Sequence, residues 1–256
     1  MTKILLSGAN GKMGSAVTRV AEQNNDAEIV AGYDINTAQN AGFPVFDSLD
    51  EIGERIKDID AIIDFSHPAM FDGLLRFAVE NNIPAVFCTT GLSEQQISDM
   101  KAAAKKSPIF FSANMSIGVN LLIDLAVKAA KLLEDNFDIE IIEKHHNQKL
   151  DAPSGTALAI ADAISDNVCY NAEYVYDRHS VRRKRGKSEI GLHAVRGGTI
   201  VGEHDVIFAG SDEVIELKHS AASKEVFAVG AVKAAAFMKG KPAGIYAMKD
   251  LIAEIN

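Results

Sequence analysis

The first 112 residues alternate short apolar runs with longer segments of helical periodicity. The short runs are rich in β-branched residues, and they cover residues 3–7, 28–33, 61–65, 85–88 and 109–112. The segments with helical periodicity lie between them, at residues 13–23, 69–80 and 94–105. Alternation of this kind is typical of βαβ units, in which each strand joins a parallel sheet and each helix covers one of its faces. We therefore predict an α/β fold with a doubly wound parallel sheet.

The pattern changes after Met115. A helical segment at 119–133 leads into strict alternation of apolar and polar residues at 137–141, in a strand predicted at 137–142, and similar alternation returns at 199–201, 204–209 and 213–220. Strands that follow strands predict a second, α+β domain with a mixed, mostly antiparallel sheet. A final helix at 226–238 closes the chain. We predict one domain from residues 1–116 and 224–256, and a second from residues 117–223.

Composition excludes several classes of protein. Hydrophobic residues make up 47% and charged residues 24%, as in soluble globular proteins, and no apolar run reaches the roughly 18 residues of a membrane span. A net charge of −9 argues against nucleic-acid or membrane partners. The start of the chain shows no targeting leader, and two cysteines give no disulfide framework, so we expect a cytoplasmic protein.

A glycine-rich turn follows the first predicted strand. Gly8, Gly11 and Gly14 stand between that strand and a helix, where backbone N–H groups can bind a pyrophosphate. Twenty residues on, Asp34 closes the second strand and can accept hydrogen bonds from ribose hydroxyls. This combination predicts a Rossmann-type dinucleotide-binding domain. The Asp34 carboxylate would repel a 2′-phosphate and so favours NADH, although Lys12 could offset the repulsion and permit NADPH.

A second group of chemically capable residues begins where the strand at 137–142 ends. His145, His146 and Lys149 can transfer or attract protons, and Ser154, Gly155 and Thr156 open a helix whose free N–H groups suit a carboxylate. Two alternatives remain open on these residues alone. One is a metal site that includes Asp151, although consecutive strand residues point to opposite faces. The other is an inert polar loop with a simple helix cap.

With this block the chain resembles the dihydrodipicolinate (4-hydroxy-tetrahydrodipicolinate) reductases of lysine and diaminopimelate biosynthesis. The family pattern of His-His, then Lys, then Asp-x-Pro-Ser-Gly-Thr-Ala is complete here between His145 and Ala157. The similarity extends to residues 8–14, 88–91, 112–119, 196–204 and the closing helix, and so spans nearly the whole chain. The resemblance implies a homotetrameric reductase that uses NAD(P)H and removes water from a cyclic imine dicarboxylate, with the second domain serving substrate binding and oligomerisation.

The resemblance also implies roles for individual residues. His145 would be the proton donor and Lys149 a second acid, while His146, Gly155 and Thr156 would hold a substrate carboxylate, beside Ser154. The cofactor would contact Gly8, Ala9, Asn10, Gly11, Lys12, Met13, Asp34, Cys88, Thr89, Thr90, Ser112, Ala113, Asn114 and Met115. The sequence departs from the family where Cys88 replaces a common glycine and where Ile35 replaces a common arginine, which again favours NADH.

Two features receive no role from the sequence. His67 is interpreted as a loop residue near the cofactor, and the basic run from Arg182 to Lys187 as a solvated surface. Two other functions compete with the reductase: a different two-domain dehydrogenase acting on an amino acid or semialdehyde, and a regulator that binds NADH without turnover. The second would require a DNA-binding helix and a basic face, and we find neither in the sequence.

Overall fold

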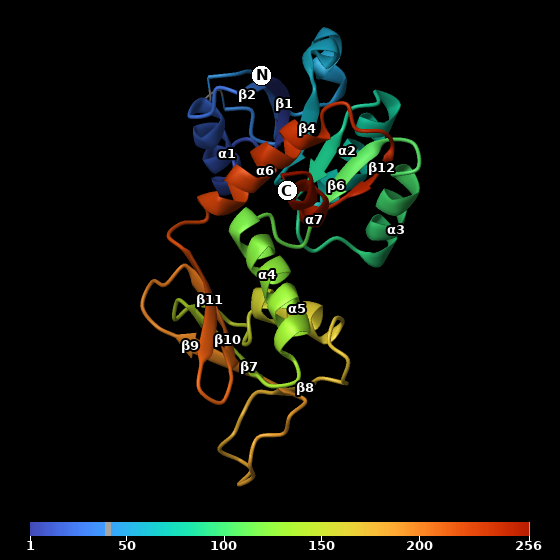
Figure 1. Cartoon of the computed structure of the whole chain (residues 1–256). Coiled ribbons are helices and arrows are strands. Elements are labelled where there is room, and N and C mark those ends of the chain that lie inside the picture. Colours follow the sequence, from blue (N-terminus) through green and yellow to red (C-terminus); the bar gives the residue numbers. More distant parts are fainter. Residues whose placement is uncertain (39–41, 256) are drawn as a thin grey trace. The chain divides into compact units, whose positions relative to one another are not determined.

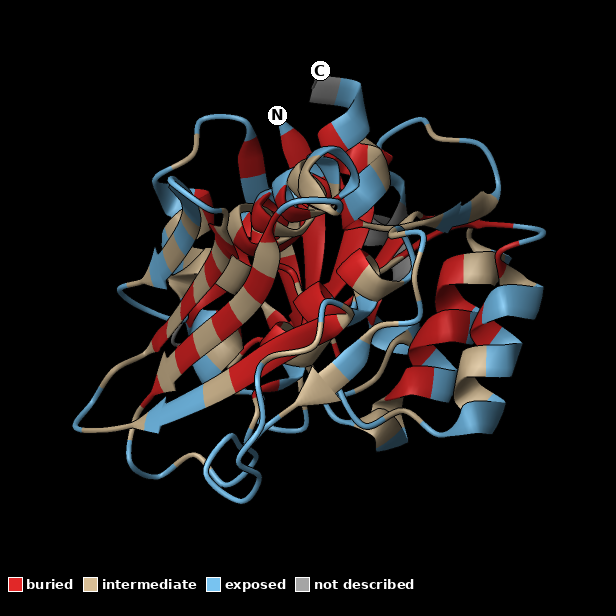
Figure 2. Ribbon diagram, turned by 60° about the horizontal axis from the view of Figure 1, so that its bottom comes forward, coloured by how far each residue is buried: buried red, intermediate tan, exposed pale blue. Residues whose placement is uncertain are grey.

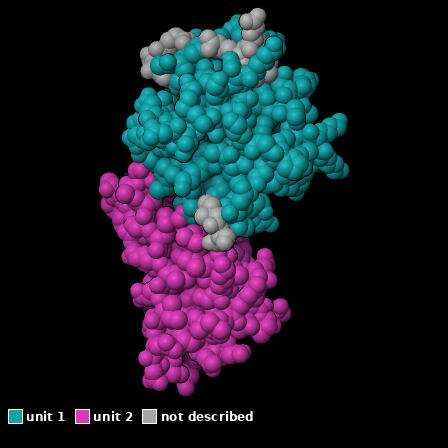
Figure 3. All heavy atoms as spheres, turned by 45° about the horizontal axis from the view of Figure 1, so that its top comes forward, with its two compact units in different colours: residues 1–117, 225–256 teal, residues 118–224 magenta. Residues whose placement is uncertain are grey.

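The computed structural model describes residues 1–38 and 42–255, apart from the side chains of residues 53–56 and 255. The chain divides into two compact units (Figure 3). Unit 1 comprises Met1–Ile117 and Glu225–Asn256, and unit 2 comprises Gly118–Lys224. Each unit has its own sheet and its own apolar core.

Unit 1 is built on a parallel sheet. Within the described residues its strand order is β12-β6-β5-β4-β1-β2-β3, and all of these pairings are parallel. The order runs outward in both directions from the boundary between β1 and β4, which makes the sheet doubly wound. The strands are β1 (Thr2–Ser7), β2 (Ala27–Tyr33), β3 (Val45–Phe46), β4 (Ala61–Asp64), β5 (Ala85–Phe87), β6 (Pro108–Phe111) and β12 (Gly244–Tyr246).

Helices cover both faces of this sheet (Figure 1). On one face Ile4, Ile63 and Phe110 pack with residues of α1, α6 and α7. On the other face Leu5, Ile62 and their neighbours pack with residues of α2 and α3. The helical elements are α1 (Lys12–Glu22), a 3₁₀ helix (Asp50–Asp58), α2 (Pro68–Glu80), α3 (Glu94–Ala103), α6 (Glu225–Met238) and α7 (Met248–Ile255). Because successive strand residues face opposite sides, each central strand serves both cores, and Figure 2 shows these strands buried.

Unit 2 is a five-stranded sheet with helices on one face, in the order β11-β10-β7-β9-β8 for the described residues. Alternate residues of β7 and β10, such as Ile139, Ile141, Val206 and Phe208, are buried against α4 and α5. The elements are α4 (Ile117–Leu133), β7 (Asp138–His145), α5 (Gly155–Ser165), β8 (Glu173–Val175), β9 (Glu189–Arg196), β10 (Gly202–Ala209) and β11 (Val214–Ala221).

The predicted fold class is confirmed, with corrections in its details. The second sheet is mixed, but β7–β9 and β8–β9 are parallel, so only two of its four described pairings are antiparallel. The strand predicted at 199–201 is wrong, because these residues belong to the turn that precedes β10. The helix predicted to close the chain is followed by β12 and α7. Strand β9 was missed because residues 189–192 are all buried, so apolar and polar residues do not alternate there.

Candidate active site

The predicted cofactor segments of unit 1 all follow the carboxyl ends of neighbouring parallel strands. The glycine turn follows β1, Asp34 follows β2, residues 88–90 follow β5, and residues 112–115 follow β6. These strands are adjacent in the order β6-β5-β4-β1-β2, so their ends lie along one edge of the sheet. Doubly wound sheets bind ligands at this edge, where the strand order reverses.

Close packing requires glycine at two positions of the turn after β1. Gly8 has φ +76°, and a Cβ there would lie 2.7 Å from the Phe65 carbonyl oxygen. A Cβ on Gly14 would lie 2.2 Å from the Gly8 carbonyl oxygen. The first turn of α1 has no side-chain cap, so its N–H groups are available to an anion. The exposed Lys12 adds a positive charge to this helix start. The turn therefore fits the pyrophosphate of a dinucleotide.

Asp34 is tied to the same turn. One of its carboxylate oxygens accepts the Asn10 N–H at 2.9 Å, and the other accepts the Asn36 N–H at 3.0 Å. The Asn10 side chain in turn donates to the Asn36 and Ala38 carbonyl oxygens. The structure thus holds the carboxylate beside the glycine turn in a fixed orientation, and Asp34 remains half-exposed.

The loops after β4, β5 and β6 are held by local hydrogen bonds. Thr89 is buried and donates to the Asp64 carboxylate at 2.6 Å, while the neighbouring Thr90 is exposed. The Ser112 hydroxyl donates to the Asn114 carbonyl oxygen at 3.1 Å. His67 caps α2, since its Nδ1 accepts the Ala69 N–H at 3.1 Å. In this structure His67 therefore serves as the N-cap of α2.

In unit 2, His145 is the last residue of β7 and lies on the buried face of that strand. Glu143, two positions earlier, has the same orientation because side chains of a strand alternate. His145 Nδ1 lies 2.6 Å from Glu143 Oε2. Arg196, which pairs with His145 in the β7–β9 register, donates to both carboxylate oxygens of Glu143 at 2.7 and 2.8 Å.

The Glu143 carboxylate is completely buried but remains ionised. Burial raises the pKa of Glu143, but the hydrogen bonds from Arg196 and His145 outweigh burial and hold the pKa below its ordinary value. The Ser154 N–H also donates to this carboxylate, at 3.0 Å. Glu143 therefore joins β7, β9 and the start of α5.

Ser154 and His204 form the other side of this cluster. The Ser154 hydroxyl caps α5 by accepting the Ala157 N–H at 3.1 Å, and it lies 3.0 Å from His204 Nε2. His204 is buried, and its ring meets the His145 ring edge to face with centroids 5.3 Å apart. Burial and the nearby His145 lower the pKa of His204 to about 4, so this ring is neutral at neutral pH.

The remaining predicted residues surround the start of α5. Lys149 Nζ lies 2.9 Å from the Asp151 carboxylate, and this hydrogen bond lowers the pKa of Asp151. The Lys149 N–H donates to the His146 carbonyl oxygen at 3.2 Å, so residues 146–149 form a tight turn. Gly155 is exposed at the first position of α5, with open space where a Cβ would stand.

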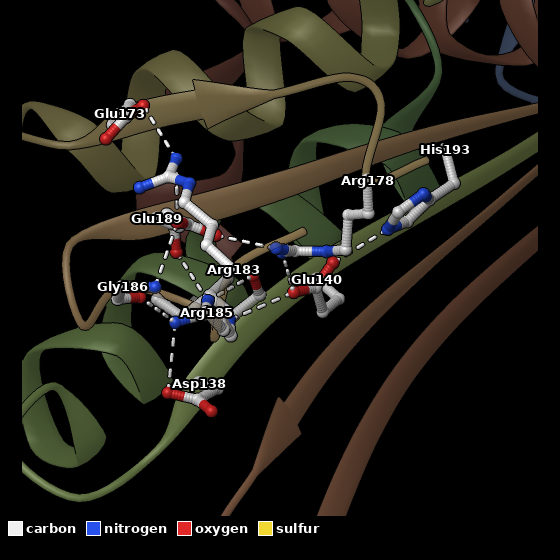
Figure 4. Close-up of polar contacts among 10 residues, drawn as sticks. Asp138, Glu140, Glu173, Arg178, Arg183, Arg185, Gly186, Glu189 and His193 are labelled. Carbon is white, nitrogen blue, oxygen red and sulfur yellow. Dashed lines mark hydrogen bonds and ion pairs between the residues drawn. The ribbon is translucent and has the colours of Figure 1, made fainter. Parts of the chain in front are cut away.

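Most of the basic run is exposed, as predicted, but Arg183 and Arg185 in it, and Arg178 before it, are paired with carboxylates. Figure 4 shows Arg178, Arg183 and Arg185 pointing toward carboxylates at the start of β7 and β9. Arg178 bridges Glu140 and Glu189 at 2.6 Å to each. Arg185 also donates to the Ile139 and Glu189 carbonyl oxygens. These arginines fasten the loop before β9 to the sheet.

The part of the chain that the structure describes contains no candidate metal cluster and no candidate membrane span. No three histidine, cysteine, aspartate or glutamate side chains there lie close enough together to hold a metal ion. No helix there combines the length and apolar character of a membrane span.

The residues of this cluster that the sequence analysis left without a role are Glu143, Arg196 and His204. The sequence did indicate the position of Glu143, because it lies two positions before His145 on an alternating strand. Arg196 and His204 stood in a segment that resembled the family, but only the register of β7, β9 and β10 shows that they meet His145.

The fold and these loops define a class: a Rossmann-type nicotinamide-dependent oxidoreductase with a second α/β unit. Comparison with known proteins identifies a family within this class. Models of the N- and C-terminal parts of dihydrodipicolinate reductase match residues 2–115 and 118–252. The chain therefore belongs to the dihydrodipicolinate reductase family, whose members are NAD(P)H-dependent reductases.

Relatives agree with this family, and a solved structure agrees with the fold. The 4-hydroxy-tetrahydrodipicolinate reductase of Clostridium tetani is 52% identical over 98% of this chain and 97% of its own. The corresponding enzyme of Caldanaerobacter subterraneus is also 52% identical, over 98% of each chain. The dihydrodipicolinate reductase of Paenisporosarcina superposes with a TM-score of 0.79 at 24% identity, over 96% of this chain and 97% of its own. The predictions of the family, of the fold and of an NAD(P)H-dependent reductase are confirmed, against both competing functions.

Proposed function

We propose that this chain reduces 4-hydroxy-tetrahydrodipicolinate to tetrahydrodipicolinate, with loss of water, in lysine and diaminopimelate biosynthesis, and that His145 is its principal acid. The observation that carries the assignment of His145 is the cluster at the end of β7. There a histidine is held by a buried carboxylate beside an exposed helix start. Family membership supports the reaction, and this cluster supports the choice of residues.

Side chains of this chain would donate protons to the substrate and stabilise its negative charge. Bound at the glycine turn, NAD(P)H supplies the hydride that reduces ring carbon 4. His145 donates the proton that the reduced ring takes up, because its Nδ1 is engaged by Glu143 and its Nε2 is left for the substrate. Lys149, which is partly exposed, supplies a second acid and a positive charge.

We assign the substrate carboxylates to the start of α5. The N–H groups in the first turn of a helix have no partners within that helix and favour an anion. Gly155, Thr156 and the half-buried His146 would provide this contact. Ser154 has a different part in the proposal, since its N–H and hydroxyl are engaged with Glu143, Ala157 and His204. It positions the helix start. The solved Paenisporosarcina relative is described with dipicolinate, a ring dicarboxylate, bound.

His145→Gln and Lys149→Met test the assignment. A general acid contributes about 10²- to 10⁴-fold to the rate, so each variant should lose turnover on that scale while its affinity for NADH is unchanged. The exposed His179 and Lys184 lie in the same unit, and His179→Gln and Lys184→Met are matched controls expected to keep full activity. Wild-type turnover in both His145→Gln and Lys149→Met would overturn the roles proposed here.

For the cofactor, we propose a preference for NADH with some use of NADPH. The fixed Asp34 carboxylate opposes a 2′-phosphate, the exposed Ile35 offers it no charge, and Lys12 provides a nearby cation. The contacts of residues 8–13, 88–90 and 112–115 belong to the same proposal. Steady-state kinetics with both cofactors should show a higher kcat/KM for NADH than for NADPH. Asp34→Asn should decrease the ratio of these two kcat/KM values. A wild-type preference for NADPH would contradict the proposal.

The assembly and location expected from the sequence stay predictions. A homotetramer formed through the sheet of unit 2 should give a mass of four 27.5 kDa chains by light scattering. A cytoplasmic location would be seen by cell fractionation.

A further inference from the structure

The Glu143–Arg196 ion pair lies behind His145, on the side away from its free nitrogen. We infer that these two residues jointly set the protonation of His145, the carboxylate favouring the charged ring and the guanidinium opposing it. Both are positioning residues for the reaction, because they act through His145. The inference deepens the proposed function and rests on it.

Glu143 has four polar contacts, which come from three residues. Its Oε2 contacts His145 Nδ1 at 2.6 Å and Arg196 Nη1 at 2.8 Å. Its Oε1 accepts Arg196 Nη2 at 2.7 Å and the Ser154 N–H at 3.0 Å. The carboxylate has no exposed surface, so no solvent competes for these contacts. Charge-assisted contacts of this length are stronger than neutral ones.

This arrangement fixes which nitrogen of His145 faces the substrate. An ionised carboxylate only accepts hydrogen bonds, so His145 Nδ1 carries a hydrogen and Nε2 exchanges the catalytic proton. A Cβ on Gly202 would lie 3.1 Å from His145 Nε2. The absence of a side chain at Gly202 therefore leaves room beside this nitrogen.

The charged and titratable groups around His145 come from three strands and from the turn before α5. Strand β7 provides Glu143, and β9 provides Arg196. Strand β10 provides His204, which is neutral near pH 7 because its pKa is about 4. The α5 side provides Ser154, which is uncharged, and the turn before it provides the Lys149–Asp151 pair. Arg196 also donates to the Asp151 carbonyl oxygen at 2.7 Å, so the two pairs are connected.

The two charges of the buried pair should act on His145 in opposite directions. Without the carboxylate, the remaining guanidinium would repel the charged ring, so His145 would lose its proton at lower pH. Without the guanidinium, the uncompensated carboxylate would retain the proton to higher pH. Charges at this separation in a shielded site shift a titration by about one pH unit or more. A group that merely supports the fold would not produce shifts of opposite sign.

The test is an NMR titration of His145 in the full chain, labelled with ¹³C at histidine Cε1. The His145 signal is assigned by its absence in His145→Gln. Relative to the wild type, Glu143→Gln should lower the midpoint, and Arg196→Gln should raise it, each by about one unit. The corresponding limb in the pH profile of kcat/KM should move in the same directions. Equal midpoints in both variants, or shifts of the same sign, would overturn the inference.

Arg196→Gln leaves a buried carboxylate without its cation and could prevent folding. The double variant Glu143→Gln/Arg196→Gln removes both charges and keeps hydrogen-bonding groups at both positions. Its His145 midpoint should lie between those of the two single variants. Arg196→Lys retains the charge and should keep the wild-type midpoint within a few tenths of a unit. If Arg196→Gln does not fold, a midpoint in the double variant no higher than in Glu143→Gln would overturn the inference.

Two further results separate this inference from the proposed function. Full turnover in His145→Gln would refute the role of His145, whereas the NMR midpoints would still report its coupling to the ion pair. Gly202→Ala should reduce kcat at least tenfold by covering Nε2. Wild-type kcat in Gly202→Ala would contradict the assignment of Nε2 as the reacting nitrogen.

Discussion

The buried His204 should make unit 2 sensitive to mild acid. Its pKa is lowered from 6.5 to about 4 by burial, so the folded state excludes a proton that the unfolded chain binds. A histidine whose pKa is lowered by folding stabilises the folded state at pH values above its pKa in the unfolded chain. That stability is lost as the pH falls from 6.5 toward 4. The shift of about 2.5 units corresponds to about 3 kcal/mol at 1.36 kcal/mol per unit, of which about 2 kcal/mol should be lost by pH 5.

The comparison with His204→Gln isolates this group. Glutamine can keep a hydrogen bond to the Ser154 hydroxyl but does not titrate, so the variant should lack this loss between pH 7.5 and pH 5. Urea unfolding gives the free energies, and hydrogen exchange of the β10 amides reports unit 2 separately. The exposed His179→Gln is the control and should follow the wild type. If wild type and His204→Gln lose the same free energy over this range within about 0.5 kcal/mol, the reasoning is wrong.

Three other substitutions test the fold around the proposed sites. Gly14→Ala places a Cβ 2.2 Å from the Gly8 carbonyl oxygen, so we expect calorimetry to show NADH affinity reduced at least tenfold; wild-type affinity would contradict this. Phe71→Ala removes a fully buried ring that packs on Phe87 with centroids 4.8 Å apart, and urea unfolding should show a loss of about 3–5 kcal/mol rather than less than 1. Arg185→Gln removes the anchor of the loop before β9, so thermolysin should cleave that loop faster than in wild type; equal rates would argue against an anchoring role.

The sequence predicted unit 1 better than unit 2 for a physical reason. In the doubly wound sheet every strand except β2 is followed by a helix, and residues such as Gly8 before α1 and Pro68 at the start of α2 mark the boundaries locally. In unit 2 the strands pair across long separations, and pairing register is not encoded in any one segment. The parallel β7–β9 pairing was missed for this reason, and with it the position of Arg196.

The candidate site divides in the same way. His145, Lys149 and the start of α5 lie within twelve residues of each other, so a local motif could identify them. Glu143 was within reach of the sequence, because strand alternation alone places it on the face of His145. His204 could not be found locally, since its contact with Ser154 spans 50 residues and depends on the β7–β10 register.

A consequence of these contacts is that the proposed proton donor and the proposed anion-binding helix start of unit 2 are held as one rigid piece. The Glu143 carboxylate binds His145 on one side and the Ser154 N–H on the other, and His204 holds the Ser154 hydroxyl from a third strand. The distance from His145 to the first turn of α5 is therefore set inside the core of the unit. A substrate that anchors a carboxylate at this helix start would present its ring to His145 at a constant spacing. This spacing favours a dicarboxylate ring of one size, because a shorter or longer acid anchored there would leave its reacting atom out of reach of Nε2.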